Sequence, residues 1–597
     1  MALRVGIGAV LLAVLIAAFS LRPVPEPLQS ELGGETFDGP TAVRQLDGLA
    51  QRYAHRRAGS SGDRLLGLRI REELARALPA ATVALDHFRG DTPDGGRDLL
   101  NVTATLPGAP GPGIAIVAHR DALEPGSKAE LSGTAALLAL ARAAANTRFH
   151  HSIRFVSTTG GSGGGLVGAT RVARQLRGQV EAVVVLGDLS GPRDRAPRVI
   201  GWSNRGPTAS LRLEKTVIQA LRQERLGAVP RSDAAFWPQL ARRGLPATPG
   251  EQGEVNQAGI PAVLLTSGSP VPPAADAEVD GPRFAAYGRA VMRTLSALDA
   301  SRAGPGRQQD GIELLGKVLP QWALRLVLLT VLLPLLVLAT VVVLSLHRDG
   351  HRLVAGAAWG AGCVAGPLVT GLLAVGLGRI GLVWPAVPAP YAGPAIDPGV
   401  GAWLLVVVLA GLLVATTALA RPRLAREAGG EAAAAEPTPI TVAVAVFGGL
   451  AAVALVLVVL NPVTALLVLP ALLAWPAALA PLPILGALHR VALVGVGAAL
   501  PLAAAITVAA DLDVSLGQVP WWLVLLVAGG QVTPVGMLLV SVVVGALVAT
   551  LLMLAPRRSR RGPARRGEDR PPRARADRRA RRRAVEDDLA DAIAEER

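Results

Sequence analysis

The pattern of apolar and polar positions divides the chain into two parts of different character. From about residue 25 to 310, short apolar runs alternate with amphipathic stretches, and charges occur throughout. Such alternation is typical of an α/β fold with a mostly parallel sheet sandwiched by helices. The expected strands are 80–87, 98–105, 113–118, 152–157, 182–187 and 261–266, and the expected helices are 63–77, 131–146, 166–177, 207–225 and 283–299.

Beyond Arg325 the pattern changes to long apolar segments, each near the ~20 residues that a bilayer requires. They predict an all-α transmembrane bundle of seven spans. Only Asn461 and Pro462 separate the fourth segment from the fifth, which predicts a tight helical hairpin. The stretch 521–555 fits either a lead-in followed by one helix or two short helices. The segments are 326–346, 353–376, 402–420, 440–460, 462–482, 491–510 and 531–555.

The first apolar stretch, residues 5–21, fits a signal peptide or an uncleaved anchor. An anchor is favoured because no small-x-small triplet stands at its end. The predicted organisation is therefore an N-terminal membrane anchor, an extracytoplasmic domain, a seven-span region and an arginine-rich cytoplasmic tail. Their boundaries are 1–24, 25–310, 311–556 and 557–597.

Composition supports a membrane protein, with 51% hydrophobic and 18% charged residues and a mean hydropathy of +0.42. The net charge of +15 comes almost wholly from arginine, a bias typical of GC-rich bacterial genomes. The basic run 557–583 could attract nucleic acid or anionic lipid, and its place beside a membrane span favours lipid. Membrane lipids are thus expected partners, and nucleic acid is not. With Cys363 as the one cysteine, an intrachain disulfide framework is excluded.

Arginine placement predicts the topology, since short cytoplasmic loops carry an excess of basic residues. Loops 347–352 and 421–439 are basic, whereas loop 385–401 has no basic residue. Together with Arg4 and the tail, these loops predict eight spans in the plasma membrane with both termini cytoplasmic. The span cores contain no ionisable residue, which argues against a proton-coupled transporter.

Three strand ends in the α/β part carry polar residues where active sites of such sheets lie: His119-Arg120-Asp121, Thr158-Thr159-Gly160 and Asp188. Around them the chain resembles metallopeptidase family 28, the dizinc aminopeptidases. The resemblance is carried in order by DLLNVTATLPG, IAIVAHRDAL, LSGTAALLALARA, SIRFVSTTGGSGGGLVGATRVARQL, VVVLGDLSG and GIPAVLL. It implies a zinc-aminopeptidase-like fold and a hydrolase ancestry.

The resemblance carries over only part of the metal site. His119 matches the family's histidine ligand, Asp121 its orienting carboxylate and Asp188 a later aspartate ligand. The bridging aspartate falls on Ala129, with Glu130 one place off. The glutamate pair, which supplies the general base and a ligand, falls on Ser162 and Gly163. No histidine lies between 152 and 310 to supply the last ligand.

The expected function is therefore binding or scaffolding by a pseudoenzyme domain with a degenerate zinc site and no catalytic residue, and with a peptide or envelope protein as partner. No cofactor is expected. One alternative is an active membrane metallopeptidase with zinc in a rearranged site, in which His119 and Asp188 act with Glu130 or Asp121. Another alternative is a lipid-handling bundle with the external domain as a lid.

Overall fold

The computed structural model describes residues 2–29, 36–191, 195–226, 235–268, 273–302, 304–308, 311–350, 353–383, 396–429 and 437–555. Residues 1–553 form one compact unit and residues 554–597 a second. The predicted arginine-rich tail and most of the loop 385–401 lie outside the described residues. The description below concerns the first unit.

A seven-stranded mixed sheet is the centre of the α/β part, with the strand order β2-β3-β5-β4-β6-β8-β7. The four neighbours β5, β4, β6 and β8 are parallel, and the outer strands pair antiparallel. The predicted parallel sheet is confirmed for these four strands. The antiparallel outer strands make the whole sheet mixed. The strands are β2 (Thr82–Thr92), β3 (Gly95–Leu106), β4 (Gly113–His119), β5 (Ile153–Thr158), β6 (Val180–Leu186), β7 (Arg198–Ile200) and β8 (Ala262–Thr266).

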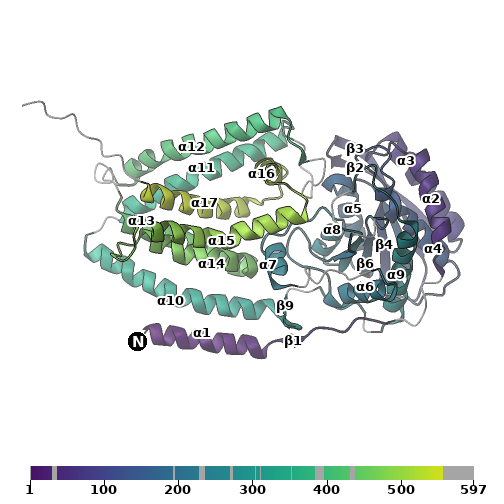
Figure 1. Ribbon diagram of the computed structural model, residues 1–597, viewed down its shortest axis with the longest axis horizontal. Helices are drawn as coiled ribbons and strands as arrows, with labels where there is room; N and C mark the ends of the chain where they lie inside the picture. Colours follow the sequence, from purple (N-terminus) through teal and green to yellow (C-terminus); the bar gives the residue numbers. More distant parts are fainter. Residues whose placement is uncertain are drawn as a thin grey trace, which may run out of the picture. The chain divides into compact units, whose positions relative to one another are not determined.

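Helices cover both faces of this sheet (Figure 1). Strand β4 has apolar side chains on both faces, and both must be covered. Ile114 and Ile116 pack in one hydrophobic cluster, and Ala115 and Val117 pack in another on the opposite face. A strand buried on both sides reads as a continuous apolar run, as β4 does. The first cluster includes residues of α2 (Gly39–Arg52), α3 (Ser61–Ala77), α4 (Ser132–Ala144), α6 (Leu211–Gln223) and α9 (Gly281–Ala300); the second includes residues of α5 (Val167–Leu176) and α8 (Gln252–Gln257).

The structure adds elements that the sequence pattern did not predict. These are α2, α7 (Phe236–Gly244), α8, the strand β7 and a small sheet of order β1-β10-β9. Its strands are β1 (Arg22–Pro23), β10 (Lys317–Leu319) and β9 (Ile312–Leu314). This sheet joins the segment after the first helix to the segment that precedes the membrane bundle.

Seven helices of the described residues are long and apolar enough to cross a membrane, in agreement with the predicted count. The stretch 521–555 resolves into a short helix, α16, followed by one long helix, α17. Pro534 stands at the start of α17 rather than at a kink. The long helices are α10 (Gln321–Arg348), α11 (Leu353–Arg379), α12 (Val400–Gly429), α13 (Pro439–Leu460), α14 (Pro462–Leu479), α15 (Ala487–Asp511) and α17 (Pro534–Leu554); α16 is Val519–Ala528.

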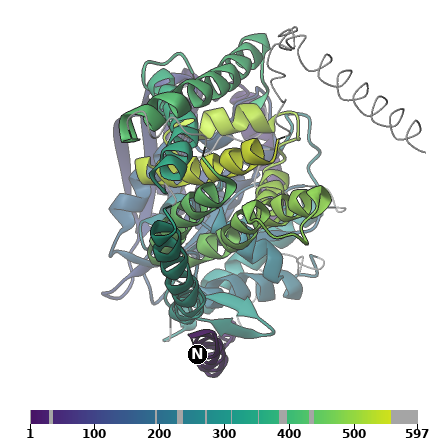
Figure 2. The same ribbon diagram turned by 90° about the vertical axis from the view of Figure 1, so that its left-hand side faces the viewer.

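Local chemistry accounts for the ends of these helices. Asn461 ends α13 and caps α14, since its side-chain oxygen accepts a hydrogen bond from the amide of Val463 at 3.1 Å. The predicted tight hairpin is thereby confirmed. The first helix, α1 (Ala2–Phe19), contacts α10, and the two lie side by side in both views (Figures 1 and 2).

The helix α7 connects the α/β part to the membrane helices. Arg242 binds Asp511 at the end of α15 through two contacts, Nε to Oδ2 at 2.6 Å and Nη2 to Oδ1 at 2.8 Å. The Arg242 guanidinium lies 4.2 Å from the centroid of the Trp202 ring. The carbonyl oxygen of Gly244 accepts a 2.7 Å hydrogen bond from Thr464 of α14. The α/β part is therefore attached to the bundle by specific polar contacts.

Candidate functional site

The predicted site residues lie at the carboxyl ends of β4, β5 and β6. His119 is the last residue of β4, Thr158 ends β5, and Asp188 follows β6 by two residues. His119 and Asp188 line one cavity of about 40 Å³, together with Glu130 and Glu251. The structure thus brings the two predicted metal ligands to one place.

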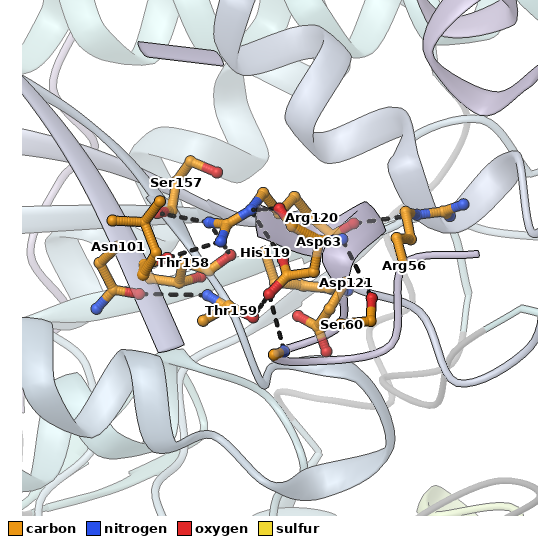
Figure 3. Close-up of polar contacts among 12 residues, drawn as sticks. Arg56, Ser60, Asp63, Asn101, His119, Arg120, Asp121, Ser157, Thr158 and Thr159 are labelled. Carbon is orange, nitrogen blue, oxygen red and sulfur yellow. Dashed lines mark hydrogen bonds and ion pairs between the residues drawn. The ribbon is translucent and has the colours of Figure 1, made fainter. Parts of the chain in front are cut away.

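Arg120 holds the end of β4, next to His119, in place (Figure 3). Its fully buried guanidinium pairs with Asp63 of α3, with Nε 2.9 Å from Oδ1. It also donates hydrogen bonds to the carbonyl oxygens of Leu100 at 2.7 Å and Thr158 at 3.2 Å. Burial raises the pKa of Asp63, and the charge of Arg120 opposes that shift. A paired and hydrogen-bonded buried charge of this kind holds β3, β4, β5 and α3 in one geometry.

Asp121 accepts hydrogen bonds from the glycine loop, residues 160–165. Its two carboxylate oxygens accept hydrogen bonds from the backbone amides of Gly161 at 3.0 Å and Ser162 at 3.2 Å. Asp121 acts on His119 through its charge, which helps to raise the histidine pKa. Its hydrogen bonds in this structure therefore hold the loop, and its role in orienting His119 stays a prediction.

Asp188 is surrounded by hydroxyl groups. Its carboxylate accepts hydrogen bonds from the hydroxyls of Ser132 at 3.3 Å, Ser190 at 2.9 Å and Ser267 at 3.0 Å, and from the Ser190 amide at 2.8 Å. Burial raises the pKa of Asp188, and these hydrogen bonds oppose the shift. The lone pairs that a metal ion would use are largely occupied by the chain itself.

Two glutamates flank the His119 ring. The Nε2 atom lies 3.7 Å from Oε1 of Glu130, and the Nδ1 atom lies 4.0 Å from Oε2 of Glu251. Glu130 also accepts a hydrogen bond from Ser162, and Glu251 accepts one from Thr158 at 2.5 Å. The sequence identified Glu130 as an acid one place from the bridging position and as a possible ligand of a rearranged site, but it did not identify Glu251, which precedes α8 far along the chain.

This acidic surrounding controls the charge of His119. Burial by itself would lower the histidine pKa, but the contact with Glu130 and the charges of Glu251 and Asp121 raise it to about 9. Burial raises the pKa of Glu251, and the positive His119 opposes that shift. Glu130, Glu251 and Asp121 therefore favour the protonated form of His119.

Two positions that match carboxylate ligands of the family carry no carboxylate here. Among the described residues, no three His, Cys, Asp or Glu side chains are grouped to hold a metal ion. Gly163, which matches one of the family's glutamates, has a left-handed backbone (φ 71°), and a Cβ atom there would collide with the side chain of Leu123. Ala129 offers a buried methyl group where the bridging aspartate would stand. Of these positions, none can supply a carboxylate.

Comparison with known proteins agrees with the resemblance read from the sequence. The profile of Peptidase family M28 matches residues 101–235. No curated protein matches the chain.

Similar solved structures include BSAP, a zinc aminopeptidase from Bacillus subtilis, with 11% identity over 46% of this chain and 99% of its own (TM-score 0.37). LapB from Legionella pneumophila is 14% identical over 47% of this chain and 79% of its own (TM-score 0.38). A glutaminyl cyclase from Fimbriiglobus ruber is 14% identical over 44% of this chain and 95% of its own (TM-score 0.34).

Proposed function

We propose, from the premise that residues 101–235 are a Peptidase family M28 domain, that this domain has lost dizinc catalysis and acts in binding or scaffolding. It does so as part of a protein with seven candidate membrane spans. The partner is a peptide or an envelope protein, and no cofactor is required. The domain lies on the extracytoplasmic side of the plasma membrane, as the loop charges predict.

The observation that carries this proposal is the state of Asp188. Three serine hydroxyls and one amide bind its carboxylate, with three of these contacts on Oδ1 and the Ser267 contact on Oδ2, so a zinc ion would compete with hydrogen bonds at either oxygen. Catalytic zinc sites in proteins usually have three protein ligands. Among the described residues, His119 Nε2 has no hydrogen-bond partner, and the neighbouring Glu130 and Glu251 favour the protonated form of the ring, so a metal ion there would have to displace a proton.

The same cavity has features suited to binding a polar group. His119 Nε2 and Glu251 Oε2 are buried without a hydrogen-bond partner. One is a donor and the other an acceptor, and both belong to residues that line the cavity. Unsatisfied buried polar atoms favour a bound group that completes them. A chain terminus or a side-chain amide of a peptide has the required pair of groups.

The two unpartnered atoms also support the alternative, a working metallopeptidase with a rearranged site. In that case His119 would lose its proton to a metal ion, and Glu251 with Glu130 would complete the ligand set. Thr158 binds Oε1 of Glu251 and Ser162 binds Oε1 of Glu130, so the other oxygen of each glutamate could act as a ligand while these hydrogen bonds stay in place. The alternative therefore predicts that metal binding depends on Glu251, a residue that the dizinc pattern does not include.

The two functions are separated by metal content and turnover of the full chain in detergent. We expect less than one equivalent of zinc per chain by mass spectrometry after incubation with zinc and desalting. Hydrolysis of aminoacyl nitroanilides should show no chelator-sensitive component, because a missing general base alone reduces the rate by roughly 10²–10⁴-fold.

The control is a pair of variants, His119→Ala and Glu251→Gln. In the proposed function neither variant changes zinc content or hydrolysis relative to the unaltered chain. Stoichiometric zinc that disappears in both variants, or turnover that both abolish, would establish the metallopeptidase instead.

A further inference from the structure

A second and larger cavity lies where the α/β part meets the membrane helices. Its volume is about 470 Å³, within the roughly 300–1,000 Å³ of small-molecule sites. The α/β part contributes residues 204–206 and 244–247, and the bundle contributes residues of α13, α14, α15, α16, α17 and the segment before α17. None of these residues lines the His119 cavity, so the two sites are separate.

Most of the wall is hydrocarbon supplied by membrane helices. Leu457 and Leu460 come from α13, and Leu523 and Leu526 come from α16. Further apolar lining residues are Ala505 and Val508 of α15 and Val535 and Leu539 of α17. An occupant of this wall gains about 25 cal/mol for each Å² of apolar surface that leaves water. The wall therefore favours an alkyl chain.

One part of the lining is polar and basic. Arg205 is exposed, and among the described residues that line the cavity it is the only ionisable one. Its Nη2 atom makes one long contact, 3.5 Å to the carbonyl oxygen of Gly530. The neighbouring acid Glu254 accepts hydrogen bonds from Thr170 at 2.9 Å and Asn204 at 3.4 Å. Burial raises the pKa of Glu254, and these hydrogen bonds and the charge of Arg205 oppose that shift. The guanidinium thus retains donors for a further acceptor.

Trp522 adds an aromatic ring to this wall. The side chain lines the cavity and is only 5% exposed, and its indole Nε1 is itself buried. The ring therefore enlarges the apolar surface that an alkyl chain would contact.

We propose that this cavity binds one anionic phospholipid. The acyl chain occupies the leucine-rich wall, and the phosphate lies toward Arg205. A phosphate suits a guanidinium because it accepts paired, charge-assisted hydrogen bonds. The absence of any acidic residue from the described lining disfavours a cationic ligand. This site is additional to the proposed binding role of the His119 cavity.

The test uses the full chain, delipidated in mild detergent and titrated with phosphatidylglycerol or phosphatidylcholine of identical acyl chains. Native mass spectrometry counts the lipids bound. We expect one phosphatidylglycerol per chain, held about tenfold more tightly than phosphatidylcholine, because both lipids carry a phosphate but phosphatidylcholine adds a choline cation that Arg205 repels. Arg205→Gln should remove this preference. The matched control Arg222→Gln changes an exposed arginine of α6 outside the cavity and should keep it.

Two filling variants, Ala505→Phe and Leu526→Trp, test the acyl-chain part. Each should lower binding of both lipids at least several-fold while the chain stays monodisperse. The proposal is overturned if both lipids bind equally to the unaltered chain, or if binding survives in both filling variants. A co-purified peptide that phosphatidylglycerol does not displace would also overturn it, in favour of a protein ligand.

Discussion

At the scale of single residues, His119 and Asp188 were identifiable from the sequence because each follows an apolar strand. Glu251 was not, since it precedes a six-residue helix with no motif of its own, and only the fold brings it near His119. The hydroxyl groups around Asp188 were also hidden, because Ser132 and Ser267 come from separate elements. The sequence shows which residue types could bind a metal ion, but it does not show which neighbouring groups already donate hydrogen bonds to them.

The raised pKa of His119 predicts how stability depends on pH. The group titrates near 6.5 in the unfolded chain and near 9 in the folded chain, so the folded state binds the proton more tightly. The resulting stabilisation is fully present below pH 6.5 and is lost as the pH rises through about 9. Its size is roughly 3 kcal/mol, from about 1.4 kcal/mol for each pKa unit.

Thermal unfolding of the full chain in detergent, followed at several pH values across this window, measures the loss. His119→Gln should flatten the decline, and the control His87→Gln, which changes an exposed strand histidine, should keep it. A decline of equal size in the His119 variant would show that other groups cause it.

At the scale of elements, strong periodicity predicted the strands of the sheet and the seven long apolar helices. Short elements escaped prediction: β7 has three residues, and α8 has six. The helix α2 was missed although Asp38 caps it by accepting a hydrogen bond from the Thr41 amide at 3.0 Å and Pro40 stands in its first turn. It contacts α9 and α4, so tertiary packing contributes to its stability.

The attachment of α7 to α15 depends on Asp511. Its carboxylate binds Arg242 with two contacts and Arg198 with one at 3.3 Å, and the side chains of Arg242 and Asp511 are 8% and 17% exposed. Asp511→Asn should therefore cost about 3 kcal/mol, the low end of the range for breaking a buried pair. Hydrogen exchange at the amides of α7 should become faster.

Asp513 provides the matched control. It lies two residues further on and is exposed, so Asp513→Asn should change stability by no more than about 0.5 kcal/mol. Equal exchange rates of α7 in the two variants would mean that apolar packing, rather than the ion pair, holds this helix.

At the scale of the whole molecule, the length of α16 affects the number of membrane spans and therefore the side on which the chain ends. It has ten residues, too few to cross the ~30 Å of a bilayer core at 1.5 Å per residue. With α1 as an anchor, seven further spans keep both termini on the same side. Reporter fusions after Asp310 and after Arg566 should report the extracytoplasmic and the cytoplasmic side, respectively. An extracytoplasmic signal from the second fusion would contradict this arrangement.

The left-handed backbone at Gly163 limits which substitutions this position tolerates. A glutamate introduced there by mutation would meet Leu123 and an unfavourable backbone conformation, so it would reduce stability before it could bind anything. A second carboxylate would also be needed at Ala129, inside the core. Each of these carboxylates alone would reduce stability. A dizinc centre built on these two positions would therefore need both substitutions together with changes in the residues around them.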